Sequence, residues 1–374
     1  MGRKRNLNWL ERKLETLRSF EGSLLGYVGS SPDVKQLATR LGLSSSEVLR
    51  LGANENFFVD SNFLNEVFLE ALDGVDLRLY DPKAMVELRE ALGVYVRVPP
   101  ECLVVGSGSE QLVDFIVKFF LEKGDNGISI EPSFFMYEKR VWLSGATLLT
   151  VPLKKNLFLD VEGILEKVTQ KTKLIFVCSP NNPTGNQFGW NEIKKLADES
   201  PAIVVVDEAY AEFGDYSLCP LAVNEKNVVV VRTFSKAFGL AGLRFGYAVA
   251  HKGLASVFSE IIPYTVSTIT ARYVQKLLGK IEVVQKWIDM VKEERERLAK
   301  GLRAINGMEV LDSKANFITF KPYESAEHIH KELLEKGIIV KDLGDLPLIG
   351  HCLRVTVGLP HMNDRFLKTL SEIA

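Results

Sequence analysis

Cysteine is scarce in this chain, and the few cysteines that occur lie far apart. The 374 residues include Cys102, Cys178, Cys219 and Cys352. No two of them stand at the spacing of a metal-binding or redox motif, so neither a zinc site nor a disulfide framework is expected. A large chain with few cysteines suits a reducing compartment, and we therefore expect a cytoplasmic protein.

Long apolar runs, a signal segment and an excess of charge of one sign are lacking too. No run approaches the ~18 apolar residues of a membrane span. The N-terminus shows no apolar stretch followed by a small-residue cleavage site. Lysine and arginine number 46 against 48 aspartates and glutamates, and the formal net charge is −2. We therefore expect neither a membrane nor a nucleic acid as partner.

Short apolar runs alternate with helical patterns between residues 80 and 275. The runs are nearly continuous, which is typical of strands covered on both faces in a mostly parallel sheet. Helices are expected between them, for example over residues 109–122 and 190–198. We predict an α/β fold with a seven-stranded sheet, helices on both faces and ligands at the carboxyl ends of the strands. The predicted strands are 103–105, 128–130, 148–151, 174–178, 203–206, 228–231 and 247–249.

The flanking segments are predicted to contribute a smaller α+β domain. Residues 1–21 carry apolar side chains at helical spacing, typical of a packing or dimerisation arm. Residues 283–304 show the pattern of a long, half-exposed helix. A helix over 326–336 and a closing helix should accompany three strands, at 316–320, 338–340 and 353–357. The predicted organisation is an N-terminal arm or part of the small domain over 1–50, a large domain over 51–280 and a small C-terminal domain over 281–374.

The clearest chemical motif is a lysine that follows the strand at 228–231. The strand leads through Thr233 and Ser235 to Lys236, and Arg244 follows about two helical turns later. This order places one amine beside an anion site. A cofactor that carries both an aldehyde and a phosphate requires that combination.

A second part of the anion site is expected where residues 104–111 lead from a strand into a helix. The segment offers small residues, free backbone N–H groups and a helix N-terminus. It is not a Rossmann fingerprint, because Gln111 replaces the third glycine, and no Gly-Lys-Ser/Thr follows as in a Walker loop. The predicted phosphate-binding residues are Ser107, Gly108, Ser109, Ser235 and Arg244.

Two further strand ends carry polar residues that a pyridine ring could use. Asp207 follows the buried run 203–206, where a carboxylate is costly unless it is paired. It could cap a helix, or it could pair with a pyridinium nitrogen. Tyr210 lies one turn further on, and Asn182 lies in a turn-rich loop beside Pro183. Each of these two could reach a ring hydroxyl.

Phe134 and Arg354 each allow a structural and a functional interpretation. Phe134 follows a strand and could stack on a cofactor ring or pack in the core. Arg354 lies inside an apolar strand, and arginine is rarely buried without a partner. Its partner could be a structural carboxylate, or the carboxylate or phosphate of a substrate, since the planar fork suits both.

Taken in order along the chain, these residues resemble the fold-type I aminotransferases that depend on pyridoxal 5'-phosphate (PLP). The matching motifs are Asn182-Pro183-Thr184-Gly185, Asp207-Glu208-Ala209-Tyr210, Ser235-Lys236 with Arg244, and Arg354. The chain is most similar to the histidinol-phosphate aminotransferase branch, on residues 51–56, 78–82, 106–110 and 353–358.

The resemblance implies a role for each residue. Lys236 would hold PLP covalently and act as the catalytic residue. Asp207 would pair with the ring nitrogen, Phe134 would stack on the ring, and Tyr80 would reach the phosphate from the partner subunit of a homodimer. Asn182 and Tyr210 would bond the ring hydroxyl. The implied substrate-binding residues are Asn54, Lys341 and Arg354.

The implied reaction is a transamination between an amino compound and a 2-oxo acid, with L-histidinol phosphate and 2-oxoglutarate as the expected pair. Lys341 stands where this branch tends to carry a second arginine, and Phe57 and Gln111 also depart from its pattern. Transamination of aromatic or other amino acids and decarboxylation of phosphothreonine are the alternatives within PLP chemistry. A PLP-fold binding protein without turnover is the alternative from another class.

Overall fold

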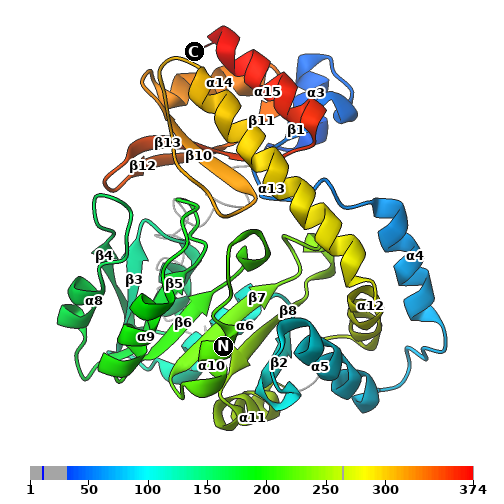
Figure 1. Cartoon of the computed structure of the whole chain (residues 1–374), viewed down its shortest axis with the longest axis vertical. Coiled ribbons are helices and arrows are strands. Elements are labelled where there is room, and N and C mark those ends of the chain that lie inside the picture. Colours follow the sequence, from blue (N-terminus) through cyan, green and yellow to red (C-terminus); the bar gives the residue numbers. More distant parts are fainter. Residues whose placement is uncertain (1–10, 12–31, 263–264, 374) are drawn as a thin grey trace, which may run out of the picture.

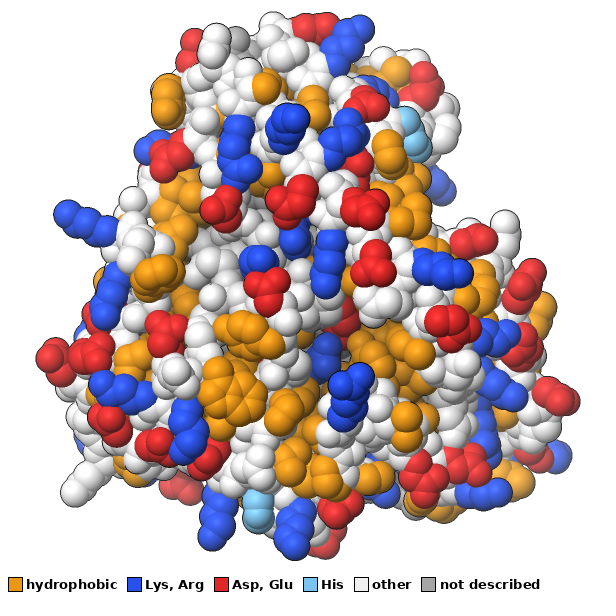
Figure 2. Space-filling model, in the orientation of Figure 1, with side chains coloured by type: hydrophobic (Ala, Val, Ile, Leu, Met, Phe, Trp, Pro, Cys, Tyr) orange, Lys and Arg blue, Asp and Glu red, His pale blue; other side chains and the backbone are white. Residues whose placement is uncertain are grey.

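The computed structural model describes residues 11, 32–262 and 265–373, which form a larger and a smaller part (Figure 1). The helix predicted over residues 1–21 lies outside the described residues, apart from Glu11. Within the described chain, every helix is too short or too polar to span a lipid bilayer. Figure 2 shows basic and acidic side chains mixed over one face, without a broad patch of one sign.

The larger part is built on a seven-stranded sheet with the strand order β2-β8-β7-β6-β5-β3-β4. β8 runs antiparallel to both of its neighbours, and the remaining pairs are parallel. The predicted fold class and the seven predicted strands are thereby confirmed. The strands are β2 (Leu103–Gly106), β3 (Asn126–Glu131), β4 (Thr147–Pro152), β5 (Thr172–Cys178), β6 (Ile203–Asp207), β7 (Val228–Thr233) and β8 (Gly246–Ala250).

The strand β7 shows why the apolar runs are continuous. Val229 and Val231 belong to the cluster packed around α6, whereas Val228 and Val230 belong to the cluster that includes residues of α10. Because successive side chains of a strand point to opposite faces, both faces of β7 must be apolar. The helices of this part are α4 (Ser61–Leu72), α5 (Pro82–Val96), α6 (Ser109–Phe120), α7 (Met136–Leu143), α8 (Val161–Lys167), α9 (Trp190–Glu199), α10 (Cys219–Asn224), α11 (Lys252–Ile261) and α12 (Thr268–Leu278).

The smaller part consists of an antiparallel sheet of order β12-β13-β10-β9, covered by helices. The long helix α13 (Ile281–Ala304), yellow in Figure 1, connects it with the larger part. The other elements are β9 (Met308–Val310), β10 (Phe317–Pro322), α14 (Ala326–Glu335), β11 (Ile338–Ile339), β12 (Lys341–Leu346), β13 (Gly350–Thr356) and α15 (Pro360–Ile373).

A short parallel pairing brings the beginning of the described chain to this smaller part. β1 (Leu49–Arg50) pairs with β11, and α3 (Val34–Leu41) packs nearby through Leu37 and Ala38. This contact supports the grouping of residues before 50 with the C-terminal region. The division at residues 50 and 280 stays a prediction.

Candidate active site

A cavity of about 250 Å³ lies at the carboxyl ends of β5, β6 and β7. Parallel strands end at one edge of the sheet, which is why residues far apart in the sequence meet there. The residues that line it include Ser109, Phe134, Asn182, Asp207, Tyr210, Ser235, Lys236 and Arg244. The structure therefore brings together most of the site residues predicted from the sequence.

Lys236 lies in the sequence between two buried aromatic residues whose rings pack against each other. Phe234 and Phe238 stack with their ring centroids 3.8 Å apart, and each is fully buried. Asn56 donates from Nδ2 to the carbonyl oxygen of Ala237 at 2.8 Å, which ties the loop after β1 to the same segment. The backbone on either side of Lys236 is thus fixed.

The amine of Lys236 points toward that loop and is poorly solvated. Its Nζ donates to the carbonyl oxygen of Ala53 at 3.0 Å. Burial lowers the pKa of Lys236 to about 8, helped by the positive charges of Arg354 and Arg244 and opposed by Glu55 and Asp207. The lowered pKa increases the share of neutral amine near physiological pH, and the neutral form is the one that acts as nucleophile or proton acceptor.

Asp207 ends β6 and receives two hydrogen bonds. The Tyr137 hydroxyl donates to Oδ2 at 2.8 Å, and the backbone N–H of Ala209 donates to Oδ1 at 3.1 Å. Burial raises the pKa of Asp207 to about 6, although both hydrogen bonds oppose the shift. The next helical segment begins only at Ala211, so Asp207 does not cap a helix, and a buried carboxylate is left facing the cavity.

Asn54 and Tyr210 join the two parts of the molecule beside this cavity. Asn54 Nδ2 donates to the Tyr210 hydroxyl at 3.0 Å, and Asn54 N donates to Thr356 Oγ1 at 2.9 Å. Asn54 has φ 56, in the left-handed region that asparagine tolerates better than most residues. The hydroxyl of Tyr210 is therefore positioned by a residue from the loop after β1.

Arg354 lies in β13 and reaches from the smaller part to Asn182, which lines the cavity. Its Nη1 donates to Asn182 Oδ1 at 2.5 Å, and its Nη2 donates to the carbonyl oxygen of Gly52 at 3.0 Å. The guanidinium is 5.1 Å from the ring centroid of Phe317. Arg354 is only 3% exposed, and its guanidinium is thereby fixed next to Asn182.

The predicted anion site forms where the glycine-rich turn meets Arg244. Gly108 precedes α6 with φ 86, and a Cβ there would lie 2.9 Å from Arg244 Nη2. Only glycine permits this approach. Arg244 Nη1 also lies 3.4 Å from Ser235 Oγ. A cation, a hydroxyl and a helix N-terminus therefore converge.

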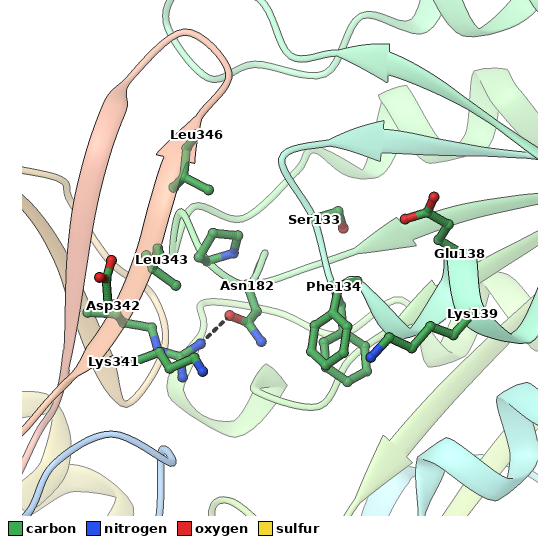
Figure 3. Close-up of a pocket in the computed structure, with 12 residues that line it drawn as sticks. Ser133, Phe134, Glu138, Lys139, Asn182, Lys341, Asp342, Leu343 and Leu346 are labelled. Carbon is green, nitrogen blue, oxygen red and sulfur yellow. Dashed lines mark hydrogen bonds between the residues drawn. The ribbon is translucent and has the colours of Figure 1, made fainter. Parts of the chain in front are cut away.

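Six predicted residues are not among those that line this cavity, namely Asn54, Tyr80, Ser107, Gly108, Lys341 and Arg354. Asn54, Gly108 and Arg354 lie next to residues that do line it, as described above. Ser107 donates its backbone N–H to Gln111 Oε1 at 2.7 Å, so the side chain that departs from the family pattern occupies one donor of the turn. Tyr80 is 80% exposed, at the end of the loop before α5. Lys341 lines a neighbouring cavity of about 300 Å³, together with Arg354 (Figure 3).

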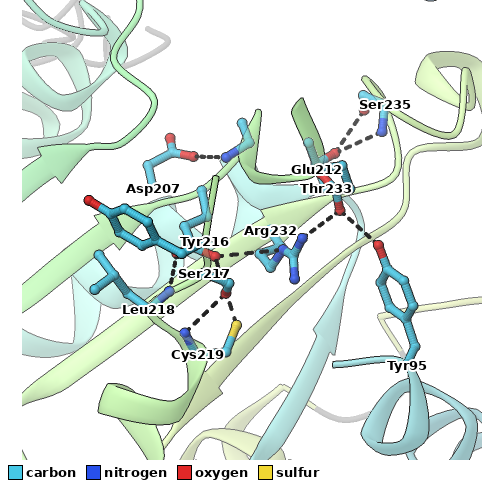
Figure 4. A network of polar contacts seen from close by, with 12 residues as sticks. Tyr95, Asp207, Glu212, Tyr216, Ser217, Leu218, Cys219, Arg232, Thr233 and Ser235 are labelled. Atoms are coloured by element: carbon cyan, nitrogen blue, oxygen red, sulfur yellow. Dashed lines mark hydrogen bonds and ion pairs between the residues drawn. The ribbon is translucent and has the colours of Figure 1, made fainter. Parts of the chain in front are cut away.

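A buried network of ion pairs and hydrogen bonds, which was not predicted from the sequence, lies at the end of β7 (Figure 4). Arg232 Nη2 pairs with Glu212 Oε1 at 2.7 Å, and its Nε lies 3.8 Å from Glu208 Oε2. Tyr95 donates to Glu212 at 3.2 Å, and Ser217 donates to Glu208 at 2.7 Å. An arginine inside a run of valines was the available signal, the same signal that singles out Arg354. The network fixes the strand that leads to Lys236.

Comparison with known proteins assigns this chain to a family. Residues 46–370 match the family described as Aminotransferase class I and II. Histidinol-phosphate aminotransferase of Ruminiclostridium cellulolyticum is 37% identical over 331 residues, 87% of this chain and 92% of that protein. Histidinol-phosphate aminotransferase 1 of Archaeoglobus fulgidus is also 37% identical, over 87% of this chain and 99% of its own. Among solved structures, histidinol-phosphate aminotransferase from Sinorhizobium meliloti in complex with pyridoxal-5'-phosphate superposes with a TM-score of 0.81 at 24% identity, covering 91% of this chain and 94% of that chain.

Proposed function

The chain belongs to the aminotransferase class I and II family, and we propose that it transfers the amino group of L-histidinol phosphate to 2-oxoglutarate with PLP as its cofactor. The family match confirms the predicted enzyme class. The observation that carries the proposal is one cavity in which a buried amine, a buried carboxylate and an anion site occur together. The names of the relatives support the choice of substrate.

The residues of the cavity fit PLP at each of its functional groups. Lys236 offers an amine to the aldehyde, and Asp207 offers a carboxylate to the ring nitrogen. The glycine at position 108, which leaves no room for a side chain against Arg244, makes a cradle for the phosphate. Phe134 lines the same cavity and offers a face to the ring.

Bound PLP supplies an electron-accepting ring to the carbon that carries the substrate amine. Asp207, when ionised, keeps a proton on the ring nitrogen and so maintains that capacity. Lys236, with a pKa of about 8 in the protein, would accept the Cα proton of the substrate and return a proton to the former aldehyde carbon of the cofactor. Asn182 and Tyr210 are held by Arg354 and Asn54 respectively and would orient the ring through its hydroxyl.

The substrate side of the site is formed by the smaller part. Arg354 would bind the anionic group of each substrate, with Lys341 from the neighbouring strand and Asn54 from the loop after β1. Both halves of the reaction use the same cavity, so the phosphate of the amino donor and a carboxylate of 2-oxoglutarate would meet the same cations. We further propose a homodimer in which Tyr80 contributes to the partner's site. The proposed location is the cytoplasm, which suits the four free cysteines.

A substrate panel tests the proposal directly. The purified holoenzyme is given histidinol phosphate, phenylalanine, tyrosine, aspartate or phosphothreonine with 2-oxoglutarate, and the glutamate formed is measured. Histidinol phosphate should give the highest kcat/KM, and Lys236→Ala should abolish both glutamate formation and the visible absorption band of the bound cofactor. Glutamate formed only from an aromatic amino acid would refute the substrate, and release of carbon dioxide from phosphothreonine would refute the reaction type.

A further inference from the structure

Two carboxylates for which the motifs predict no role line the cavity that contains Lys236. Glu55 lies in the loop after β1, and Glu110 lies in the first turn of α6. Together with Asp207 they stand against two cations in the lining, Lys236 and Arg244. The ionised lining residues therefore carry more negative than positive charge, which by itself disfavours the binding of a phosphate.

Each of these two carboxylates is paired with an arginine that lies outside the cavity. Arg50 Nη2 lies 2.9 Å from Glu55 Oε1, and Arg140 Nη2 lies 2.6 Å from Glu110 Oε1. Neither arginine is among the described residues that line the cavity. The two arginines thus compensate the negative charge of the lining from behind it.

Of the two carboxylates, Glu110 is the one beside the anion site. It follows Ser109, the first residue of α6, and Gly108, which lies against Arg244. A carboxylate in the first turn is stabilised by the positive end of the helix, the same end that would meet a phosphate. Glu55, by contrast, lies on the side of Lys236, whose ammonium form its charge stabilises.

Arg140 lies in α7 and joins this helix to α6 through two carboxylates. Besides Glu110, its Nη1 lies 3.5 Å from Asp114 Oδ1, and Lys118 Nζ lies 2.6 Å from the other oxygen of Asp114. Asp114 would therefore keep a cation if Arg140 were replaced, whereas Glu110 would lose its ion pair. Glu110 also interacts electrostatically with Lys139, which is unchanged in every variant compared below.

We propose that Arg140 is a positioning residue for the cofactor phosphate, on which it acts through Glu110. Its charge compensates the carboxylate, and its hydrogen bond directs that carboxylate toward α7. The anion site can then use the N-terminus of α6 without repulsion from a free acid in the same turn. The inference rests on the proposed function, since it takes the anion to be the phosphate of PLP.

The alternative is that the ion pair between Arg140 and Glu110 only fastens α7 to α6. Under that alternative, its loss would lower stability and would leave the preference for a phosphorylated cofactor unchanged. Pyridoxal has the ring and the aldehyde of PLP but lacks the phosphate. The ratio of the two affinities therefore isolates the contribution of the phosphate.

The experiment uses the full-length protein freed of cofactor. The Kd of pyridoxal divided by the Kd of PLP is measured by absorbance at low ionic strength, in wild type, Arg140→Gln, Arg140→Lys, Glu110→Gln and the double variant Arg140→Gln with Glu110→Gln. Arg297→Gln is the matched control, because Arg297 also pairs with two carboxylates, Glu294 and Asp364, each at 2.6 Å, and does not line the cavity. The Tm reports folding in each variant.

We expect the ratio to fall about five- to twentyfold in Arg140→Gln and to recover at high salt, because the repulsion is partly screened by solvent. Arg140→Lys should retain most of the ratio, and Arg297→Gln all of it. Glu110→Gln should raise the ratio about twofold or more, and the double variant should return to within about threefold of wild type, because the repelling charge is gone.

Two results would overturn the inference. One is a ratio that is unchanged in both Arg140→Gln and Glu110→Gln, and the other is a ratio that stays low in the double variant. Because Glu110→Gln leaves Arg140 in place, it tests the inference even if Arg140→Gln does not fold.

The outcome for the proposed function is read separately. A wild-type protein that binds PLP but makes no glutamate from histidinol phosphate refutes the proposed reaction, and the ratio of affinities still tests the role of Arg140. A wild-type protein that binds PLP no more tightly than pyridoxal refutes the inference itself.

Discussion

The hydroxyl of Tyr137 should set the charge on Asp207, and Tyr137→Phe tests this with little change in shape. Tyr137 is buried, and its ring stacks on Phe176 with centroids 4.9 Å apart and planes 11° apart. Phenylalanine keeps that stacking. The only group removed is the donor that lies 2.8 Å from Asp207 Oδ2.

The expected shift follows from the strength of that hydrogen bond. A hydrogen bond to a charged group contributes about 1.5–3 kcal/mol, and one pKa unit corresponds to about 1.4 kcal/mol. The pKa of Asp207, already raised to about 6 by burial, should therefore rise by a further one to two units or so. At pH 7 the ionised share of Asp207 would fall from about nine-tenths to between about one half and one tenth.

The assay is the affinity of the cofactor-free protein for PLP, followed by absorbance between pH 6 and pH 9. Only an ionised Asp207 can hold the proton on the ring nitrogen, so Tyr137→Phe should weaken binding at pH 7 by about two- to tenfold. The difference should shrink toward pH 9, where Asp207 is ionised in both proteins.

Tyr273→Phe is the matched control for Tyr137→Phe. The Tyr273 hydroxyl donates to the carbonyl oxygen of Leu64 at 3.1 Å, between α12 and α4, and it contacts no group of the site. Its removal should leave the pH dependence of PLP affinity as in wild type. The same profile for Tyr137→Phe would refute the control of Asp207 by Tyr137.

Three further predictions concern buried charges. Burial lowers the pKa of Lys236 to about 8, so burial of its charged form destabilises the folded protein below pH 8, and this destabilisation fades as the pH rises toward the ordinary pKa of lysine. In urea titrations, Lys236→Met should therefore raise the free energy of unfolding of the cofactor-free protein by up to about 3 kcal/mol at pH 7 and by less at pH 10. Arg232→Met would leave Glu208 and Glu212 buried without their cation, which should cost about 3–5 kcal/mol at pH 7 and less at pH 5, again in urea titrations. Arg354→Lys keeps the charge and loses the planar fork, so steady-state kinetics should show a KM for the amino donor raised about tenfold or more.

The sheet could be predicted from the sequence because strands that are buried on both faces consist of nearly continuous apolar residues. β6, β7 and β8 are almost unbroken runs of buried apolar residues, a pattern typical of strands covered on both faces. β12 has no such apolar run. Its residues 341–346 are half-exposed, and its pairing with β13 shifts register between Asp342 and Gly344, so the sequence there reads as a loop.

The residues proposed to bind the cofactor could be named from the sequence because they stand at strand ends. Asp207 and Lys236 interrupt apolar runs, and such interruptions are costly without a purpose. Tyr137 leaves no comparable signal. It lies on the short helix α7, and which side chains of that helix turn toward the sheet depends on how the helix packs rather than on its own sequence pattern. The hydrogen bond from Tyr137 to Asp207 could therefore be found only in the three-dimensional structure.

The two neighbouring cavities are formed by different sets of elements. Asp207 and Lys236 lie at the ends of β6 and β7, and burial raises the pKa of Asp207 and lowers the pKa of Lys236, which favours the neutral form of each. The neighbouring cavity is lined by Lys341 and Arg354 from the hairpin β12–β13, which we propose bind the substrate. Because the two cavities share only Phe134 and Asn182 among their lining residues, a neutral substitution of Lys341 should change which amino compound is accepted, and its effect should appear in KM.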